Sequence, residues 1–395
     1  MKKILIIAST YMDLEISGNN RTNFIPQFLL KNGYDVKLIM SDFSHHRKKH
    51  IKNDFEKREY EVITIHEPGY SKNVELRRIY SINVFSRNLN LFLKSYKETF
   101  DYVYVFTPPH KIVKIAKKFS TKTGAKLVVD VRDLWPEAYK MIIKNTLLYN
   151  LIFFPFKIYA DHIYKLADII ISVSDTYRNR ALKVNKDCIS KTIYIGTSLS
   201  EFDNYRNNTN ILKPKNEFWM IYVGTLGKSY DIKLVMDSMI IIKNMGYKEI
   251  KFIILGNGPH EKKLRSYAIK NDVNVKFMGR KKYKEMVSIL VLGDLVVNPL
   301  VKNAPQSIIN KHADYAASGI PVINTQNNKE YINLLKKFNA GFNVYNFDKK
   351  ELAKKIIFFY KNNQKREEMG KNHRILAETL FDRDKIYNNL LEILL

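Results

Sequence analysis

Short apolar runs alternate with helix-like segments along almost the whole chain, and this alternation limits the folds that the sequence can adopt. Apolar runs of this length, separated by amphipathic stretches, predict parallel strands connected by helices. Seven runs precede residue 204, namely Lys2–Ser9, Asp35–Asp42, Tyr60–His66, Tyr102–Pro108, Lys126–Asp133, Ile169–Ser174 and Lys191–Gly196. Five follow residue 216, namely Phe218–Thr225, Lys251–Gly258, Val275–Arg280, Asp294–Leu300 and Ile320–Thr325. The sequence therefore predicts an α/β protein with two parallel sheets.

The two series of strands indicate two domains. A chain of 395 residues is long enough for two or three domains of about 150 residues each. The segment Asn204–Asn216 is polar and lacks apolar periodicity, which predicts a linker. A strand, a loop containing Gly18, a helix over Arg21–Asn32 and a second strand are typical of a Rossmann-like unit. We expect Rossmann-like domains over 1–204 and 205–379, a cleft between them, and a C-terminal helix of about 380–395 that packs back on the first domain.

Composition narrows the classes of function. The chain carries 66 Lys and Arg against 39 Asp and Glu, a formal charge of +27. This excess indicates a nucleic acid, an anionic lipid or a phosphorylated substrate, although codon usage in an AT-rich genome would also enrich lysine. An apolar content of 45% excludes a disordered chain. The single cysteine, Cys188, excludes a disulfide framework and a Cys-based zinc site, and we expect a cytoplasmic protein without a secretory signal.

The longest uncharged apolar stretch, Asn145–Phe156, is shorter than the ~20 residues that span a bilayer. The segment Leu147–Asp168 is nevertheless strongly apolar and aromatic, with Lys157 and Lys165 interspersed. Such a segment could lie on an anionic membrane surface, or it could form a buried pair of helices. The sequence leaves both interpretations open.

Glycines follow three of the predicted strands in the second half of the chain. Gly224 ends a strand that runs towards a helix, and this arrangement leaves backbone N–H groups free to bind an anion, with Lys228 close by. A tight turn with a solvated lysine would give the same pattern. Gly256 and Gly279 follow two further strands. All three glycines are therefore expected at the carboxyl edge of the second sheet, where open α/β sheets bind ligands.

The segment Ala304–Thr325 combines a polar loop, a helix and a strand. Lys311 and Asp314 are one helical turn apart and share a face. A carboxylate that reaches a ribose diol, beside a lysine that reaches a phosphate, would suit a nucleotide-sugar. An i,i+3 surface ion pair is the alternative.

Two other motifs point away from a metal site. His46 and His50 have i,i+4 spacing within HHRKKH, but no HExxH glutamate accompanies them, which favours a solvated basic loop. Asp382 and Asp384 form the D-x-D of the chain, and their position before the last predicted helix favours helix capping. We therefore expect no metal.

Five motifs together resemble family 4 of the GT-B retaining glycosyltransferases: VRDLWPE, YVGTLG, GNGP, FMG and NKHADYAASGIPVINT. The resemblance is strongest to bacterial members that build capsule or O-antigen and transfer N-acetylated sugars such as L-fucosamine. It implies two Rossmann-like domains that face a cleft, a UDP-sugar donor and an undecaprenyl-diphosphate-linked saccharide acceptor. It further implies a peripheral enzyme at the inner face of the cell membrane that needs neither a metal nor a cofactor.

The resemblance assigns donor-binding roles residue by residue. Gly18 corresponds to the first glycine loop, which approaches the donor diphosphate. The phosphate-facing loop and the loops near the nucleobase correspond to Gly224, Thr225, Lys228, Gly256, Asn257 and Gly279. Thr225 stands where the family has an arginine, so Lys311 or Lys228 would compensate for that charge.

The family's E-x7-E pair is altered in this chain. Asp314 replaces the second glutamate, which contacts ribose, and is shorter by one methylene. Gln306 replaces the first glutamate, which contacts the donor sugar, so the backbone of Ser307 and Ile308 would contribute more at this place.

The resemblance places Arg132 and Asp133 at the edge of the first sheet, where many relatives have His-Asp. Asp133 would accept or position the proton of the acceptor hydroxyl, although capping of a following helix would also explain it. Retaining catalysis of this type needs no enzyme nucleophile, because the departing phosphate can take the proton. The protein then supplies orientation and positive charge.

Two other functions remain as alternatives. A nonhydrolysing UDP-GlcNAc 2-epimerase also has two Rossmann-like domains, but it needs a cluster of His, Asp and Glu that these motifs do not supply. The charge of +27 would suit a nucleic-acid-binding protein, but the sequence has no RRM, KH or helix-turn-helix motif, so we expect no nucleic-acid partner.

Overall fold

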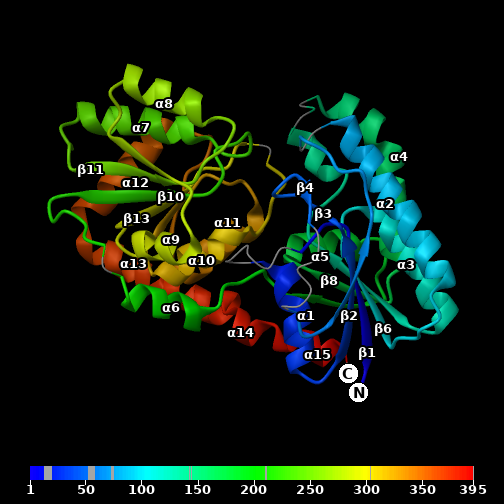
Figure 1. Ribbon diagram of the computed structural model, residues 1–395. Helices are drawn as coiled ribbons and strands as arrows, with labels where there is room; N and C mark the ends of the chain where they lie inside the picture. Colours follow the sequence, from blue (N-terminus) through cyan, green and yellow to red (C-terminus); the bar gives the residue numbers. More distant parts are fainter. Residues whose placement is uncertain are drawn as a thin grey trace. The chain divides into compact units, whose positions relative to one another are not determined.

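The computed structural model describes residues 1–12, 20–51, 58–72, 75–141, 143, 145–209, 211–302 and 304–394. These residues form two compact units, drawn in Figure 1. The first unit comprises residues 1–139, 145–193 and 389–395, and the second comprises residues 140–144 and 194–388.

The first unit is built on a seven-stranded parallel sheet of order β5-β2-β1-β6-β7-β8-β9. Its strands are β1 (Lys3–Ala8), β2 (Asp35–Ser41), β5 (Glu61–Ile65), β6 (Tyr102–Thr107), β7 (Lys126–Val131), β8 (Ile169–Ser172) and β9 (Ile189–Thr192). Its helices are α1 (Arg21–Lys31), α2 (Leu76–Ser95), α3 (His110–Thr123), α4 (Thr146–Lys165) and α5 (Asp175–Leu182), and the 3-10 helix η1 (Glu137–Met141) precedes α4. A short antiparallel hairpin joins β3 (Phe43–Ser44) to β4 (Lys49–His50).

The central strands of this sheet are almost fully buried, as expected where helices cover both faces. Helices α2, α3 and α4 lie side by side on one face (Figure 1). A buried ion pair anchors α1 to the sheet: the Arg21 Nε donates to the Asp130 Oδ2 at 2.8 Å, and the Tyr104 hydroxyl donates to the same oxygen at 2.7 Å. Arg21 also donates to the Ile193 carbonyl. These bonds fix the start of α1 against β6 and β7.

The second unit contains a six-stranded parallel sheet of order β12-β11-β10-β13-β14-β15. Its strands are β10 (Phe218–Val223), β11 (Ile250–Leu255), β12 (Val275–Gly279), β13 (Leu295–Asn298), β14 (Val322–Asn324) and β15 (Gly341–Asn343). Its helices are α6 (Leu199–Asn207), α7 (Ile232–Asn244), α8 (Glu261–Lys270), α9 (Tyr283–Leu290), α10 (Asn310–Ser318), α11 (Lys329–Phe338), α12 (Lys349–Lys361), α13 (Asn363–Leu376) and α14 (Arg383–Ile386), with a π-helical turn η2 (Ala377–Phe381). The last helix, α15 (Asn388–Ile393), leads back to the first unit.

Alternate residues of β10 feed two cores. Met220 and Tyr222 pack with α7, α8 and α12 on one face of the sheet. Trp219 and Ile221 pack with α9, α10 and α11 on the other. Figure 1 shows α7 and α8 on one side of this sheet and α9 and α10 on the other. The strand order reverses between β10 and β13, so the carboxyl ends of these two strands mark the ligand-binding crevice expected of such a sheet.

The twelve predicted strands are confirmed, with ends that shift by at most four residues. The prediction omitted β15, because its three residues GFN give almost no apolar run. The polar segment Asn204–Asn216 was predicted to be a linker, but α6 continues to Asn207, because Leu199 and Phe202 bury one face of the helix.

The sequence left the segment Leu147–Asp168 open between a membrane-surface segment and a buried pair of helices. Residues 147–165 belong to the single helix α4, of which four residues are buried: Tyr149, Ala160, Ile163 and Tyr164. The HHRKKH segment was expected to be a solvated basic loop. Residues 45–48 form the turn of the β3–β4 hairpin and four of the six residues are exposed, although the His45 Nδ1 lies 2.5 Å from the Tyr70 hydroxyl. Burial lowers the pKa of His45 to about 4.

Candidate functional site

Three glycines lie next to one another at the carboxyl ends of adjacent strands in the second unit. The Gly224 N–H donates to the Leu255 carbonyl at 2.9 Å, and the Gly256 N–H donates to the Gly279 carbonyl at 2.8 Å. A Cβ atom at Gly256 would lie 1.8 Å from the Gly224 carbonyl oxygen, and the φ angle of Gly256 is +151°. Only glycine can occupy this position, so the edge of the sheet presents bare backbone, which we name the glycine row (Gly224, Gly256 and Gly279).

Lys311 brings a positive charge to the glycine row. It lies in α10 and is only 8% exposed, and a Cβ atom at Gly224 would lie 2.6 Å from its Nζ. The Nζ stands 4.1 Å from the centre of the Tyr222 ring and 3.8 Å from that of Tyr230. Within the residues that the structure describes, no hydrogen-bond acceptor meets this ammonium. The i,i+3 ion pair with Asp314 that the spacing allowed is therefore not formed.

Burial places the pKa of Lys311 well below its ordinary value of 10.5. The unfolded chain binds the proton of this lysine more tightly than the folded chain does. The charge therefore lowers the free energy of unfolding. This loss is complete at a pH below the lowered pKa and becomes smaller as the pH rises towards 10.5. A bound anion would offset this cost, because a buried ammonium is stabilised when an opposite charge approaches it.

Asp314 lies on the same helix and is also buried. Its Oδ1 accepts a hydrogen bond of 2.8 Å from the Tyr283 hydroxyl, which is 2.7 Å from the Thr197 Oγ1. The neighbouring Tyr315 fixes α10 to β10, since its hydroxyl accepts from the Val223 N–H at 2.8 Å. Lys311 and Asp314 thus project from a helix that is tied directly to the strand before Gly224.

The loop before α10 is held by internal hydrogen bonds. The Gln326 Nε2 donates to the carbonyls of Gln306 and Ser307, at 2.6 Å each. The Ser307 Oγ donates to the Glu330 Oε2 at 2.7 Å, and Ile308 packs in the core. The side chains of Ser307 and Ile308 therefore serve the fold. The Glu330 carboxylate of α11 thus lies at Ser307, the residue next to Gln306. Gln306 itself carries an amide instead of a carboxylate.

The other predicted residues lie around this edge. Thr225, Lys228 and Asn257 are exposed, and the Thr225 carbonyl accepts from the Tyr222 hydroxyl at 2.9 Å. The expectation of free N–H groups at the helix after Gly224 is wrong at one place, because the Asp231 carboxylate caps α7 and accepts from the Leu234 N–H. An anion at the start of α7 would meet the negative charge of Asp231. A position beside Lys311 is therefore more favourable for an anion. Gly18 lies outside the described residues.

Comparison with known proteins identifies the class of this chain. Residues 203–375 match the family of group 1 glycosyl transferases, and all of them belong to the second unit. The chain is a glycosyltransferase. Among curated proteins, none matches it.

Solved structures share the fold of this glycosyltransferase along its whole length. HepE of Anabaena, in complex with UDP, aligns with a TM-score of 0.70 at 16% identity over 99% of each chain. Sucrose-phosphate synthase of Thermosynechococcus elongatus aligns at 0.72 and 14% identity, over 100% of this chain and 98% of that one. WaaG, a glycosyltransferase involved in lipopolysaccharide biosynthesis, aligns at 0.69 and 15% identity over 99% of each chain. The predicted GT-B fold with two parallel sheets is thereby confirmed.

In the first unit of this glycosyltransferase, Arg132 and Asp133 follow β7. Arg132 is exposed, with its guanidinium 5.6 Å from the centre of the Phe106 ring. Asp133 is half-buried, and its Oδ1 accepts from the Leu134 N–H at 2.9 Å. Burial raises the pKa of Asp133 to about 6, although the Leu134 N–H and the Arg132 charge act in the opposite direction. Asp133 can therefore exchange a proton near neutral pH.

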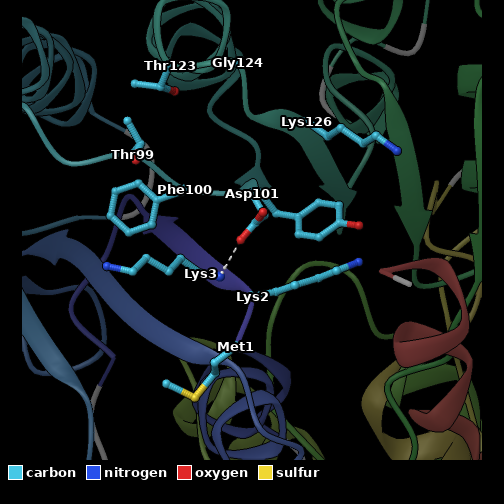
Figure 2. Close-up of a pocket in the computed structure, with 10 residues that line it drawn as sticks. Met1, Lys2, Lys3, Thr99, Phe100, Asp101, Thr123, Gly124 and Lys126 are labelled. Carbon is cyan, nitrogen blue, oxygen red and sulfur yellow. Dashed lines mark hydrogen bonds between the residues drawn. The ribbon is translucent and has the colours of Figure 1, made fainter.

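A depression of about 730 Å³ lies at the amino-terminal edge of the first sheet. Figure 2 shows its lining around Lys2, Lys3, Asp101 and Lys126, with the Lys3 N–H donating to the Asp101 Oδ2 at 2.7 Å. These residues lie at or near the amino ends of β1, β6 and β7. Ligands of open α/β sheets bind at the carboxyl ends, so we do not assign the donor to this depression.

Helix α4 exposes an apolar face in the first unit. Its large exposed side chains are Leu147, Leu148, Leu151, Ile152, Phe154, Phe156 and Ile158, and we name them the α4 face. No helix among the described residues is long and apolar enough to cross a membrane. Exposed apolar side chains gathered on one helix are typical of interaction surfaces.

Several partners of the site were not predicted from the sequence. Three tyrosines of the site were assigned no role from the sequence. Tyr222 and Tyr230 face the Lys311 ammonium, and Tyr283 contacts Asp314. The buried His110, whose Nε2 is 3.0 Å from the Trp135 carbonyl, supports the loop that carries Asp133. A polar residue directly after a buried strand, as in TPPH, was the available signal for His110.

We expect Gly256→Ala to lower the free energy of unfolding by about 3 kcal/mol, the upper range for overpacking, because the new methyl group collides with the Gly224 carbonyl. Gly246→Ala is the matched control: its φ is +93°, with open space around the missing Cβ, and it should cost only about 1 kcal/mol of backbone strain. Urea denaturation of both variants measures the difference. Equal losses would show that the close approach in the glycine row carries no special constraint.

Proposed function

We propose that this glycosyltransferase moves an N-acetylated sugar from a UDP-sugar to a lipid-linked saccharide, with retention of the anomeric configuration, in the synthesis of a bacterial surface polysaccharide. The observation that carries the proposal is the buried Lys311 ammonium beside Gly224, which has aromatic neighbours but no described carboxylate partner. HepE, which shares the fold, has been solved with UDP and with UDP-glucose, and this supports a uridine donor.

The donor diphosphate would lie over the glycine row, where the absence of side chains allows phosphate oxygens to approach the backbone. Lys311 then supplies the charge that the family's arginine provides, since Thr225 stands in its place. Asp314 reaches the ribose hydroxyls together with Tyr283. The exposed Lys228 adds charge at the rim of the site. A diphosphate in these contacts is a better leaving group, because fixed positive charge stabilises the charge that develops on it.

The transfer step needs no covalent enzyme intermediate. The bond between the anomeric carbon and the UDP oxygen breaks, and UDP leaves with the electron pair. The acceptor oxygen bonds to the same face of the anomeric carbon, and its proton passes to the leaving phosphate. Asp133, as a carboxylate, accepts a hydrogen bond from the acceptor hydroxyl and orients it, and Arg132 supplies a positive charge beside it.

The acceptor end of the proposal is a lipid-linked saccharide, such as one carried on undecaprenyl diphosphate. The α4 face gives the first unit an apolar surface, and Lys157 lies among its residues. Such a helix binds anionic membranes through buried apolar area together with lysine–lipid attraction. The protein would then act as a peripheral enzyme at the inner face of the cell membrane, where lipid-linked intermediates are built.

UDP binding to the Lys311 site is tested by thermal unfolding in EDTA. At 100 times its Kd, UDP should stabilise the wild-type protein by about 2.7 kcal/mol. Lys311→Met should lose most of this stabilisation. Without UDP, Lys311→Met should have a higher free energy of unfolding than wild type at pH 7, because the desolvated charge is gone.

Lys262→Met, an exposed lysine of α8, is the control and should leave UDP binding unchanged. An unaltered UDP affinity in Lys311→Met would contradict the assignment. GDP and single-stranded DNA complete the panel: stabilisation by GDP alone would change the donor, and salt-sensitive DNA binding without a nucleotide response would favour the nucleic-acid alternative. Conversion of UDP-GlcNAc to its 2-epimer would favour the epimerase.

The role of Asp133 predicts a pH dependence. Sugar transfer should fall as the pH drops through about 6, because protonation removes the hydrogen-bond acceptor. Asp133→Asn should lower kcat at pH 7.5 by about 100-fold, the cost of a misplaced reacting group, and should abolish this acid limb. The exposed Asp187→Asn is the control and should retain both.

A stability measurement separates this role from a structural one. Because the folded chain binds the Asp133 proton more tightly than the unfolded chain, wild type gains stability relative to Asp133→Asn as the pH falls from about 6 towards 3.8. An activity profile with the same acid limb in Asp133→Asn would exclude the catalytic role, whatever the stability result.

Membrane binding is tested by co-sedimentation with phosphatidylglycerol vesicles. Leu151→Ser combined with Phe154→Ser should weaken the partition coefficient at least about tenfold, because each fully buried side chain of this size contributes about 1.5–3 kcal/mol. Ile269→Ser, which removes an equally exposed side chain from α8, should leave binding unchanged. Equal binding of the double variant and wild type would exclude the α4 face as the membrane contact.

A further inference from the structure

The β3–β4 hairpin brings three possible metal ligands together at the carboxyl edge of the first sheet. β2 and β5 are paired in parallel with Ser41 opposite Ile65, and the Asp42 N–H donates to the Ile65 carbonyl at 3.1 Å. Asp42 and His66 therefore leave two adjacent strands at the same level. The hairpin then folds the chain back, and the Ile51 N–H donates to the Asp42 carbonyl at 2.9 Å, which places His50 beside both residues.

The ligand atoms of Asp42, His50 and His66 all lie within 4.8 Å of one another. The His66 Nδ1 is 2.7 Å from the Asp42 Oδ2, and the His50 Nε2 is 3.8 Å from the Asp42 Oδ1. Around a tetrahedral zinc ion with bonds of about 2.0–2.1 Å, neighbouring ligand atoms stand roughly 3.3 Å apart. The two observed distances bracket that separation. Small rotations of the exposed His66 side chain would complete the geometry.

The residues around the trio hold it in place. The Glu67 N–H donates to the Asp42 Oδ1 at 3.2 Å, and the Glu67 carbonyl lies 2.6 Å from the His50 Nε2. The Phe43 ring meets the His50 ring edge-on at 5.3 Å. Glu67 is itself fixed by the hydroxyls of Ser41 and Ser81, at 2.5 Å each. The Glu67 N–H thus orients the Asp42 carboxylate in the way that hydrogen-bonding groups behind a metal site orient its ligands. The His50 hydrogen bond, in contrast, uses the nitrogen that would bind the metal and only positions the ring.

The charges nearby also favour a cation. The Glu67 carboxylate lies close enough to Asp42 and His50 to interact with both. Two acidic groups, Asp42 and Glu67, therefore lie at this site. The hairpin's own Lys48 packs on the Tyr70 ring, with its Nζ 4.6 Å from the ring centre and 3.3 Å from the His45 Nδ1. The rings of His50 and His66 stack on each other at 5.3 Å, which presents both imidazoles to the same volume.

We propose that Asp42, His50 and His66 form a binding site for a divalent transition-metal ion of the zinc type. Two imidazoles and a carboxylate are ligands that zinc accepts, and three protein ligands leave a fourth position for water or an anionic oxygen. On binding, the His50 Nε2 exchanges its hydrogen bond to the Glu67 carbonyl for the metal, and the imidazole proton resides on Nδ1. The site belongs to the first unit and is separate from the donor contacts proposed for the second unit, so it does not depend on them.

The test uses the full chain without a histidine tag, stripped of metal by chelator and titrated with Co²⁺ and then Zn²⁺. Cobalt should bind with 1:1 stoichiometry and give the intense visible absorption of a four-coordinate site, and zinc should displace it. His66→Ala and Asp42→Asn should each weaken zinc binding by more than the roughly 10–100-fold that loss of a second-shell partner causes. His66 is 65% exposed, so His66→Ala should keep the metal-free stability of wild type.

His46→Ala, in the same hairpin, is the matched control and should bind zinc as wild type does. Three results would overturn the proposal: no saturable 1:1 complex, unchanged binding in His66→Ala, or loss of binding in His46→Ala with retention in His66→Ala. The last result would place the metal on the His46–His50 pair. None of these results bears on UDP binding at Lys311, so the two proposals fail independently.

Discussion

Burial of the Lys311 ammonium is the constraint around which the second unit is arranged. A charge removed from water without a carboxylate partner is costly, and the structure compensates with the faces of Tyr222 and Tyr230. The ammonium fits only because Gly224 has no side chain, and its helix keeps its register because Tyr315 binds the backbone of β10. The diphosphate that we propose to bind beside Gly224 would remove this cost.

Much of the fold follows from the sequence, because buried parallel strands leave apolar runs that a reader can locate. Strands β1, β7 and β10 illustrate this, because five of the six residues in each are buried. The features that escaped prediction are those whose stability comes from elsewhere in the chain. β15 exists because it pairs with β14, and the end of α6 exists because Leu199 and Phe202 are buried before the polar segment begins.

The residues of the candidate site likewise fall into those that the sequence could predict and those that it could not. Gly224, Gly256 and Gly279 could be located from the sequence, because a glycine after a buried strand signals a close backbone approach. Tyr230, Tyr283 and Glu330 could not, because they come from other elements and lie far from their partners in sequence. The capping of α7 by Asp231 was also hidden, since a carboxylate near a phosphate loop has the same sequence pattern whether it binds the ligand or the helix.

The two tryptophans of the chain fall one in each unit. Trp135 is half-buried next to the loop of Asp133, and Trp219 is buried in β10, with its indole N–H on the Glu217 carboxylate at 2.6 Å. Replacement of either one by phenylalanine leaves a single tryptophan, whose selectively excited emission reports on one unit alone. Emission spectra of the two variants can therefore follow the loop of Asp133 and the strand before Gly224 separately, without any added label.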